Sequence, residues 1–162
     1  MTEMFNEPEL ISELERIGNS LKRRIKVFLI GGCSMVLRGY KLATKDIDVV
    51  FANLSDIKEV TDVLKGLGFQ EVVELPKDYD ALGASAILRD IKGFQFDIFH
   101  KLVCRGLEIT DRMEKRAEFY RSLGNLDVYM MASEDIFLFK SITEREADIL
   151  DMRTLAERGL DW

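Results

Sequence analysis

Two aspartates stand two residues apart where apolar and polar side chains alternate along the chain. Asp46 and Asp48 open the segment 46–51, whose alternation predicts a β-strand with both carboxylates on one side. Their Cα atoms would lie about 7 Å apart, so both can converge on one or two hard cations, which prefer oxygen ligands. Asp97, in the alternating segment 94–99, would add a third carboxylate from a neighbouring strand. The three acids predict a site for two magnesium ions, or manganese in their place, that activates a hydroxyl and neutralises a transferred phosphoryl group.

A glycine pair, separated from the acids by thirteen residues, offers a complementary anion site. Gly31 and Gly32 follow the apolar run 27–30, which suits a buried strand, and precede a short helix expected over 34–40. A strand that turns into a helix through two glycines leaves backbone N–H groups unpaired and lets a phosphate approach them closely. Ser34 can add a hydroxyl to this cradle. The segment therefore combines an anion-binding turn with a cation-binding acid pair, and a metal-bound nucleoside triphosphate needs both.

Each of these features has an ordinary explanation when it is taken alone. The chain holds 29 acids in 162 residues, so chance predicts roughly five acid-x-acid pairs, and a glycine pair after a strand is more often only a turn. The succession of strand, glycine pair, spacer and Asp-x-Asp on an alternating strand is much less expected by chance. We therefore interpret the segment 28–50 as a nucleotide site.

The segment 28–50 resembles the signature of the DNA polymerase β-like nucleotidyltransferase superfamily. In that signature a hydrophobic residue and Gly-Gly or Gly-Ser are followed, after about nine to thirteen residues, by acid–hydrophobic–acid–hydrophobic, which residues 30–32 and 46–49 match. The chain is most similar to the small stand-alone members, which include the nucleotidyltransferase toxins of abortive-infection and toxin–antitoxin systems. The resemblance continues over 133–151, where members often carry a helix lysine followed by an acid-rich helix, whereas residues 102–125 show no match.

The resemblance implies a role for each of the three acids. Asp46 and Asp48 would bind the metal ions, while Asp97 would bind the catalytic ion and help to deprotonate the acceptor. The implied reaction transfers a nucleoside monophosphate from a nucleoside triphosphate to a hydroxyl of a tRNA or other RNA end, a protein or a small molecule, releasing pyrophosphate. An antitoxin-like protein partner is part of the same resemblance. Two alternatives stay open: a catalytically silent nucleotide-binding or regulatory module, and a metal-dependent nuclease that uses the same acids.

The resemblance also implies which groups hold the triphosphate. These are Gly31, Gly32 and Ser34, with Lys140 as a candidate counter-charge, although a solvated or snorkelling helix lysine explains Lys140 equally well. Cys33 stands where many members carry a phosphate-contacting serine. Because a thiol is a poor hydrogen-bond donor, that duty would pass to Ser34 or to backbone amides.

Other chemically active residues have simpler structural explanations. Asp148 and Asp151 lie three apart on one helix face, where pairing with Arg145 or Arg153 explains them as well as a role toward substrate does. His100 is the single histidine and by itself makes neither a triad nor a zinc site, so we expect a structural role. The basic cluster at 22–26 is more simply a solvated helix end than an RNA contact, and the aromatic residues at 94, 96 and 99 are expected in the core.

Capping and turn signals place the remaining elements. We expect a helix after Asn6, a helix capped by Ser55, strands over 69–75, 84–88 and 126–131, and two final helices, one capped by Ser133 and one opened by a Thr143–Glu146 capping box and ended by Gly159.

Composition and length describe an ordinary globular chain. With 47% hydrophobic and 32% charged residues, 162 residues predict one domain, with a sheet core over 1–131 and a helical pair over 132–162. The element order predicts an α/β or α+β fold with a mixed β-sheet flanked by helices. No apolar run approaches the roughly 18 residues that cross a bilayer, so we expect a cytoplasmic protein without a membrane partner. The net charge of −6 disfavours binding along duplex DNA.

Overall fold

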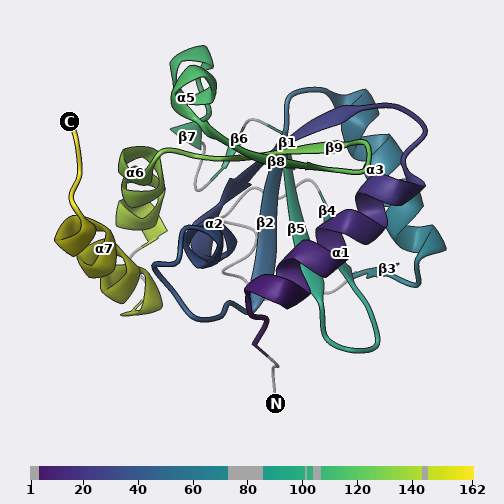
Figure 1. The fold of residues 1–162 in the computed structure, drawn as a ribbon, viewed down its shortest axis with the longest axis horizontal. Coiled ribbons are helices and arrows are strands. Elements are labelled where there is room, and N and C mark those ends of the chain that lie inside the picture. The colour runs from purple at the N-terminus through teal and green to yellow at the C-terminus, as the bar shows by residue number, and fades with distance from the viewer. Residues whose placement is uncertain (1–3, 73–85, 101, 104–106, 144–145) are drawn as a thin grey trace.

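The computed structural model describes residues 4–72, 86–100, 102–103, 107–143 and 146–162 (Figure 1). Its elements follow in the order α1 (Glu7–Ser20), β1 (Ile25–Ile30), α2 (Gly31–Leu37), β2 (Asp46–Phe51), α3 (Leu54–Gly66), β3 (Gln70–Glu71), β4 (Ala86–Arg89), β5 (Gln95–His100), β6 (Leu102–Val103), β7 (Leu107–Glu108), α5 (Asp111–Arg116), β8 (Glu118–Leu123), β9 (Leu126–Met130), α6 (Ser133–Thr143) and α7 (Glu146–Arg158). The expected capping box between α6 and α7 falls partly outside the described residues.

Seven strands form one mixed sheet in the order β3-β4-β5-β2-β1-β9-β8, and β6 pairs with β7 separately. Strand β1 runs antiparallel to β2 and parallel to β9, while β2 runs parallel to β5. The central strands β1, β2 and β5 are the three that the apolar run and the two alternating segments predict. The predicted mixed sheet with flanking helices and a C-terminal helix pair is confirmed.

Helices cover both faces of this sheet (Figure 1), and the sheet separates the core into two clusters. On one face, side chains of α1 and α3 pack against Ile47 and Val49 of β2. On the other face, α6 and α7 contribute side chains such as Leu155 to a cluster that includes Val50. Because side chains alternate along β2, Asp48 shares the face of Val50. The candidate acids therefore lie on the side of the C-terminal helices.

The N-terminal segment fixes the loop that precedes β2. The Asn6 side chain accepts the Glu9 N–H at 3.1 Å and the Glu9 carboxylate accepts the Asn6 N–H at 3.3 Å, which confirms the predicted capping box of α1. Just before it, Phe5 pairs with Thr44 through their backbones, and its ring stacks on Phe94 with centroids 3.6 Å apart. The loop end that leads into β2 is thus held against α1 and β5.

Three helix starts differ from the predictions. Helix α2 already begins at Gly31, because that residue takes φ of +67° and turns the chain directly from β1 into the helix. Helix α3 has Asn53 in extended backbone as its N-cap, so Ser55 is not the cap and lies within the first turn instead. Ser133 is likewise the first helical residue of α6.

The sheet edges also differ in extent from the predictions. β3 covers Gln70–Glu71 and β4 covers Ala86–Arg89, whereas residues 73–85 between them, with the expected loop around 78–80, are outside the described part. β8, which no sequence signal predicted, pairs with β9 at the opposite edge. Among the described residues, no helix combines the length and apolar character that crossing a membrane requires.

Candidate active site

Strand pairing brings the three predicted aspartates together on one sheet face. In the parallel pair of β2 and β5, Asp48 stands directly opposite Asp97, and Asp46 stands opposite Gln95. On its other side Asp48 stands opposite Ile30, the last residue before the glycine pair. Asp46 and Asp48 are half-buried, while Asp97 is 2% exposed. The acid pair predicted on β2 and the single acid on β5 therefore form one group beside the glycine turn.

Burial and neighbouring charges both act on the acids of this group. Burial, followed by the nearby charges of Asp97 and Asp46, raises the pKa of Asp48 well above its usual value, against an opposing effect of Lys140. A hydrogen bond between the Asp48 and Asp97 side chains acts in the same direction. Two carboxylates this close favour the binding of a proton or a cation.

The glycine turn is packed so closely that neither position has room for a side chain. A Cβ atom on Gly31 would lie 2.5 Å from Asp48 Oδ2, and one on Gly32 would lie 2.6 Å from Thr44 Oγ1. Gly31 also takes φ of +67°, which L-residues other than glycine adopt at a cost. The absence of side chains here lets the acidic strand β2 approach the backbone between β1 and α2.

Ser34 and Cys33, which follow the glycines, are both turned into the protein. Ser34 is fully buried and its hydroxyl donates to the Gly31 carbonyl at 2.7 Å. The buried Cys33 thiol donates to the Ile30 carbonyl at 3.0 Å, and burial raises its pKa, which keeps it protonated. Both side chains hold the turn in shape, so any phosphate contact would fall to backbone amides or would require Ser34 to change its partner.

Lys140 is buried in an ionic network, so the alternative that it is a solvated helix lysine is wrong. It is 7% exposed, and its ammonium lies 2.7 Å from Asp151 and 3.3 Å from Asp148. Asp151 also binds Lys41 at 3.1 Å. The two α7 acids therefore pair with lysines, whereas Arg153 pairs with Glu157 at 3.5 Å and Arg145 lies outside the described residues.

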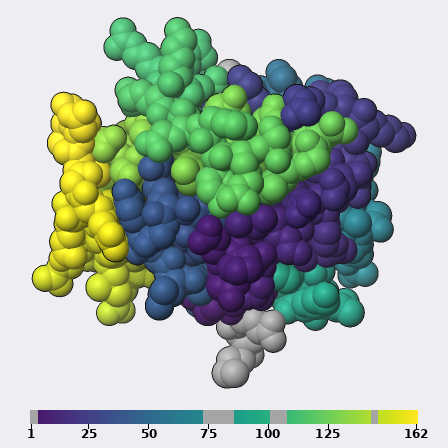
Figure 2. All heavy atoms as spheres, viewed as in Figure 1, coloured from purple at the N-terminus to yellow at the C-terminus, as the bar shows by residue number. Residues whose placement is uncertain are grey.

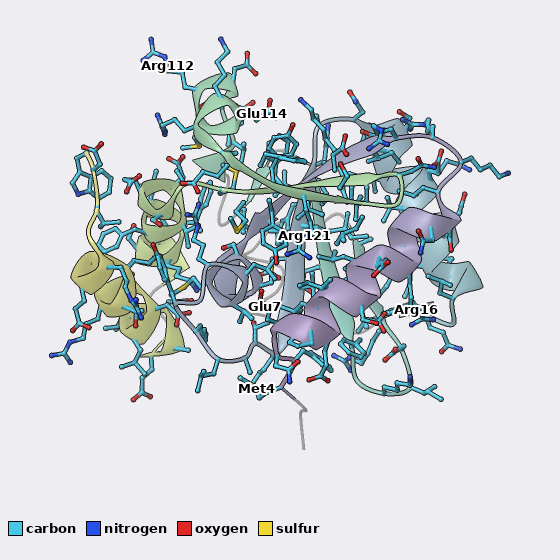
Figure 3. All side chains as sticks on the ribbon, viewed as in Figure 1. Met4, Glu7, Arg16, Arg112, Glu114 and Arg121 are labelled. Atoms are coloured by element: carbon cyan, nitrogen blue, oxygen red, sulfur yellow. The ribbon has the colours of Figure 1, made fainter. Side chains whose placement is uncertain are left out.

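These side chains face one pocket of about 350 Å³. Its walls are Met4, Gly32, Lys41, Thr44, Lys45, Asp46, Asp48, Lys140, Ala147, Asp148 and Asp151. Figure 2 shows α2 and the following loop (blue) at the surface between the start of the chain (purple) and α7 (yellow). Met4, labelled in Figure 3, marks the side of the pocket nearest the start of α1. Asp97 does not line the pocket, but it stands directly opposite Asp48, which does.

The residues expected to be structural lie away from this pocket. The His100 ring nitrogen Nε2 is 3.1 Å from the Ala52 carbonyl, and alternation along β5 puts His100 on the face opposite Asp97. In the basic cluster, Arg23 pairs with Asp56 at 2.6 Å. Arg24 pairs with Asp127 at 2.6 Å and Lys26 lies over the Tyr129 ring at 5.2 Å. These three cations thus interact with other side chains of the protein.

Sequence reasoning missed three residues of the site. Lys41 lies in a loop, where no periodicity marks it, and its pairing with Asp151 spans 110 positions. Gln95 hydrogen-bonds Asp97, and Arg89 hydrogen-bonds Gln95. The one available signal was the spacing of Gln95 and Asp97, two apart on an alternating strand, which places both on one face.

The donor set fits a hard divalent cation. Asp46, Asp48 and Asp97 supply only oxygen ligands, and the raised pKa of Asp48 reflects negative charge that a cation would offset. In the described part of the chain, no group of three or more His, Cys, Asp or Glu side chains is already arranged to hold a metal ion. Mg²⁺ does not need one, because it usually keeps several waters and binds one or two carboxylates together with substrate phosphates.

Comparison with known proteins agrees with this geometry. Residues 8–159 match the family described as "Nucleotidyltransferase of unknown function (DUF6036)". The chain belongs to this nucleotidyltransferase family. No curated protein sequence matches the chain.

Solved structures share the fold of this nucleotidyltransferase. The lincosamide antibiotic adenylyltransferase LnuA, bound to lincomycin, superposes with a TM-score of 0.64 at 17% identity, covering 95% of this chain and 98% of its own. ANT(2")-Ia in complex with adenylyl-2"-tobramycin superposes with a TM-score of 0.59 at 14% identity, covering 92% of this chain and 88% of its own. TM1012 of Thermotoga maritima, assigned as a nucleotidyltransferase, superposes with a TM-score of 0.61 at 16% identity, covering 95% of this chain and 96% of its own. The fold is therefore that of nucleotidyltransferases, consistent with the polymerase β-like superfamily.

Proposed function

We propose that this nucleotidyltransferase transfers a nucleoside monophosphate from a nucleoside triphosphate to a hydroxyl acceptor and releases pyrophosphate. The observation that carries the proposal is the alignment of Asp48 with Asp97 beside the Gly31–Gly32 turn, in reach of the pocket that holds Lys140. A metal-bound triphosphate is bound by carboxylates that hold the metal ions and by backbone N–H groups and lysines that contact the phosphates.

Each group has a defined task in the proposed reaction. Asp46, Asp48 and Asp97 would hold two Mg²⁺ ions, or Mn²⁺, which would neutralise the charge of the transferred group. Lys140 and Lys41 lie on the α7 side of the pocket and offset the charge of the triphosphate. The pair of Asp48 at the pocket wall and Asp97 next to it would accept the proton of the acceptor hydroxyl. The acceptor oxygen forms a bond to the α-phosphorus as the bond from that phosphorus to the bridging oxygen of pyrophosphate breaks.

Charge favours a compact acceptor over a polyanion. The pocket walls carry the acids Asp46, Asp48, Asp148 and Asp151 against three lysines, and the two arginines of the cluster at 22–26 pair with acids elsewhere. An RNA backbone would meet unfavourable electrostatics here. LnuA and ANT(2")-Ia, the structural neighbours, are bound to lincomycin and to adenylyl-2"-tobramycin. We therefore place small hydroxyl-bearing molecules first among the acceptors, ahead of RNA ends and proteins.

The test is incubation of the protein with each labelled triphosphate, Mg²⁺ and cell extract that is then separated into RNA, protein and small molecules. We expect label from the α-phosphate to enter the small-molecule fraction and Asp48→Asn to abolish this transfer. Asp62→Asn, which changes a 64% exposed acid of α3, is the matched control and should leave the transfer intact.

Other outcomes distinguish the alternatives. Triphosphate that binds tightly but is never consumed would point to a catalytically silent module. Cleavage of nucleic acid without any triphosphate would point to a nuclease. Full transfer by both Asp46→Asn and Asp48→Asn would refute the assignment of these residues to the active site.

A further inference from the structure

A buried glutamine holds the carboxylate of Asp97. Gln95 lies two residues before Asp97 on β5, shares its sheet face and is 3% exposed. Its Nε2 amide donates to Asp97 Oδ1 at 2.8 Å. A buried polar side chain at this position is costly unless its hydrogen bonds are made. The interaction is therefore a specific feature of the site.

Arg89 determines which way the amide of Gln95 points. It stands directly opposite Gln95 in the antiparallel pair of β4 and β5, and its Nε donates to Gln95 Oε1 at 3.0 Å, with a second contact from the terminal guanidinium nitrogen. A guanidinium can only donate hydrogen bonds, so it requires the amide oxygen on its side. The amide NH₂ must then face Asp97. Arg89 thus fixes the orientation of Gln95 in the same way that a second hydrogen-bond partner fixes a histidine tautomer.

We propose that Arg89 and Gln95 are positioning residues that hold Asp97 in place for metal binding and proton acceptance. The proposal rests on the proposed transferase function. Asp97 lies directly opposite Asp48 in the pair of β2 and β5, so two carboxylates stand side by side on this sheet face. The hydrogen bond that Gln95 donates at 2.8 Å holds the Asp97 carboxylate at this position. Asp97 therefore stays beside Asp48, where the two carboxylates would hold the ion.

The chain supplies a matched control for this pair. Gln70 of β3 stands opposite Arg89 on the other side of β4, and it is exposed. Gln70→Leu therefore changes the same residue type next to the same arginine without touching Asp97. Arg89→Ala changes an exposed residue, so it tests the pair even where Gln95→Leu impairs folding. Arg89→Lys keeps one donor toward the Gln95 amide oxygen.

Two measurements decide the question: Mn²⁺ affinity of the protein without nucleotide, followed by electron paramagnetic resonance, and the rate of nucleotide transfer. Loss of an outer partner of a metal ligand costs about 10- to 100-fold in metal affinity or activity. We expect Gln95→Leu to weaken Mn²⁺ binding and slow transfer within that range, Arg89→Ala to have a smaller effect, and Arg89→Lys to restore most of it. Gln70→Leu should match wild type in both measurements.

A double-mutant cycle tests the order of action. Because Arg89 acts through Gln95, the double variant Arg89→Ala/Gln95→Leu should resemble Gln95→Leu alone rather than show the product of both effects. Wild-type Mn²⁺ affinity and transfer in folded Gln95→Leu would overturn the positioning role and leave the proposed function standing. A wild-type protein that neither binds Mn²⁺ nor transfers nucleotide would overturn both.

Discussion

The ionised carboxylate of Asp48 is unfavourable in the folded protein, and a bound cation would reduce that cost. Its raised pKa comes first from burial and then from Asp97 and Asp46, so the ionised form is the costly one. The folded protein therefore binds the proton of Asp48 more tightly than the unfolded chain, in which an aspartate titrates near a pKa of about 3.9. This raised pKa supports the proposed metal site, because a bound cation would favour the ionised carboxylate.

The stability of the metal-free protein should consequently fall as the pH rises. The contribution of Asp48 is complete below about pH 3.9 and is lost as the pH climbs through the raised pKa of the folded state. Urea unfolding in chelator at a series of pH values measures this slope. The Asp48→Asn variant should show a flatter slope and should unfold at a higher urea concentration near neutral pH. Mg²⁺ added to the wild-type protein should also raise the urea concentration of unfolding. An unchanged slope in Asp48→Asn would show that Asp48 is not the group responsible.

Lys41 provides a test of the triphosphate side of the pocket. Its side chain is 30% exposed and pairs with Asp151 at 3.1 Å, so its removal leaves Lys140 to compensate that acid. A hydrogen bond to a charged group contributes about 1.5–3 kcal/mol, so Lys41→Met should raise the Kd for triphosphate by roughly 10- to 100-fold. Lys58→Met, on an 80% exposed lysine of α3, is the control in the same calorimetric titration. Equal affinities in the two variants would remove Lys41 from the binding site.

At the level of elements, the turn from β1 into α2 depends on the absence of side chains. Gly31→Ala places a methyl group 2.5 Å from Asp48 Oδ2 at φ of +67°, so the backbone strain alone costs about 1–3 kcal/mol. The displaced carboxylate should also reduce transfer far more than this stability loss explains. Gly66→Ala, near the end of α3 with nothing within 4 Å of the added atom, is the control and should be neutral or mildly stabilising. Thermal unfolding and transfer rates of both variants, measured together, test the contrast.

The elements that could be predicted are those whose burial leaves a pattern in the sequence. β2 and β5 alternate because one side of each packs under α1 and α3, and the alternation placed Asp46, Asp48 and Asp97 on strands correctly. β8 escaped because only Leu123 of its six residues is buried, which leaves no alternation to detect. The cap of α3 was missed for a local reason, since Asn53 and Ser55 are both good N-cap residues and only the backbone conformation separates them.

Contacts between elements were beyond the reach of sequence patterns. Nothing in β2 or β5 alone states that they are neighbours, or that Asp48 rather than Asp46 stands opposite Asp97. The pairing of Lys140 with Asp148 and Asp151 depends on how α7 returns along α6, so the α7 acids could be assigned equally well to nearby arginines. The Gly31–Gly32 turn needs residues without side chains and is also part of a recognisable motif. For that reason it was the strongest single indication of the site in the sequence.

For the whole molecule, the site lies between the sheet and the C-terminal helices, which ties catalysis to the packing of α6 and α7. Asp48 comes from the sheet, whereas Lys140 and Asp151 come from the two helices. Beside them, the apolar cluster of this face joins Val50 of β2 to Leu155 of α7. Any loosening of the helix pair would separate the lysine from the acids. The geometry of the pocket therefore requires that sheet and helices fold as one unit.

This requirement predicts a single cooperative unfolding transition for the chain, as expected for one domain. Leu155 is fully buried, so Leu155→Ala should cost about 2–5 kcal/mol and lower the Tm of the entire transition by roughly 2–4 °C per kcal/mol. Leu150→Ala, at a 59% exposed position of the same helix, should change the stability by no more than about 0.5 kcal/mol. Differential scanning calorimetry distinguishes the cases. A separate low-temperature transition that alone shifts in Leu155→Ala would mean that α6 and α7 unfold independently, and that the pocket can open without loss of the sheet.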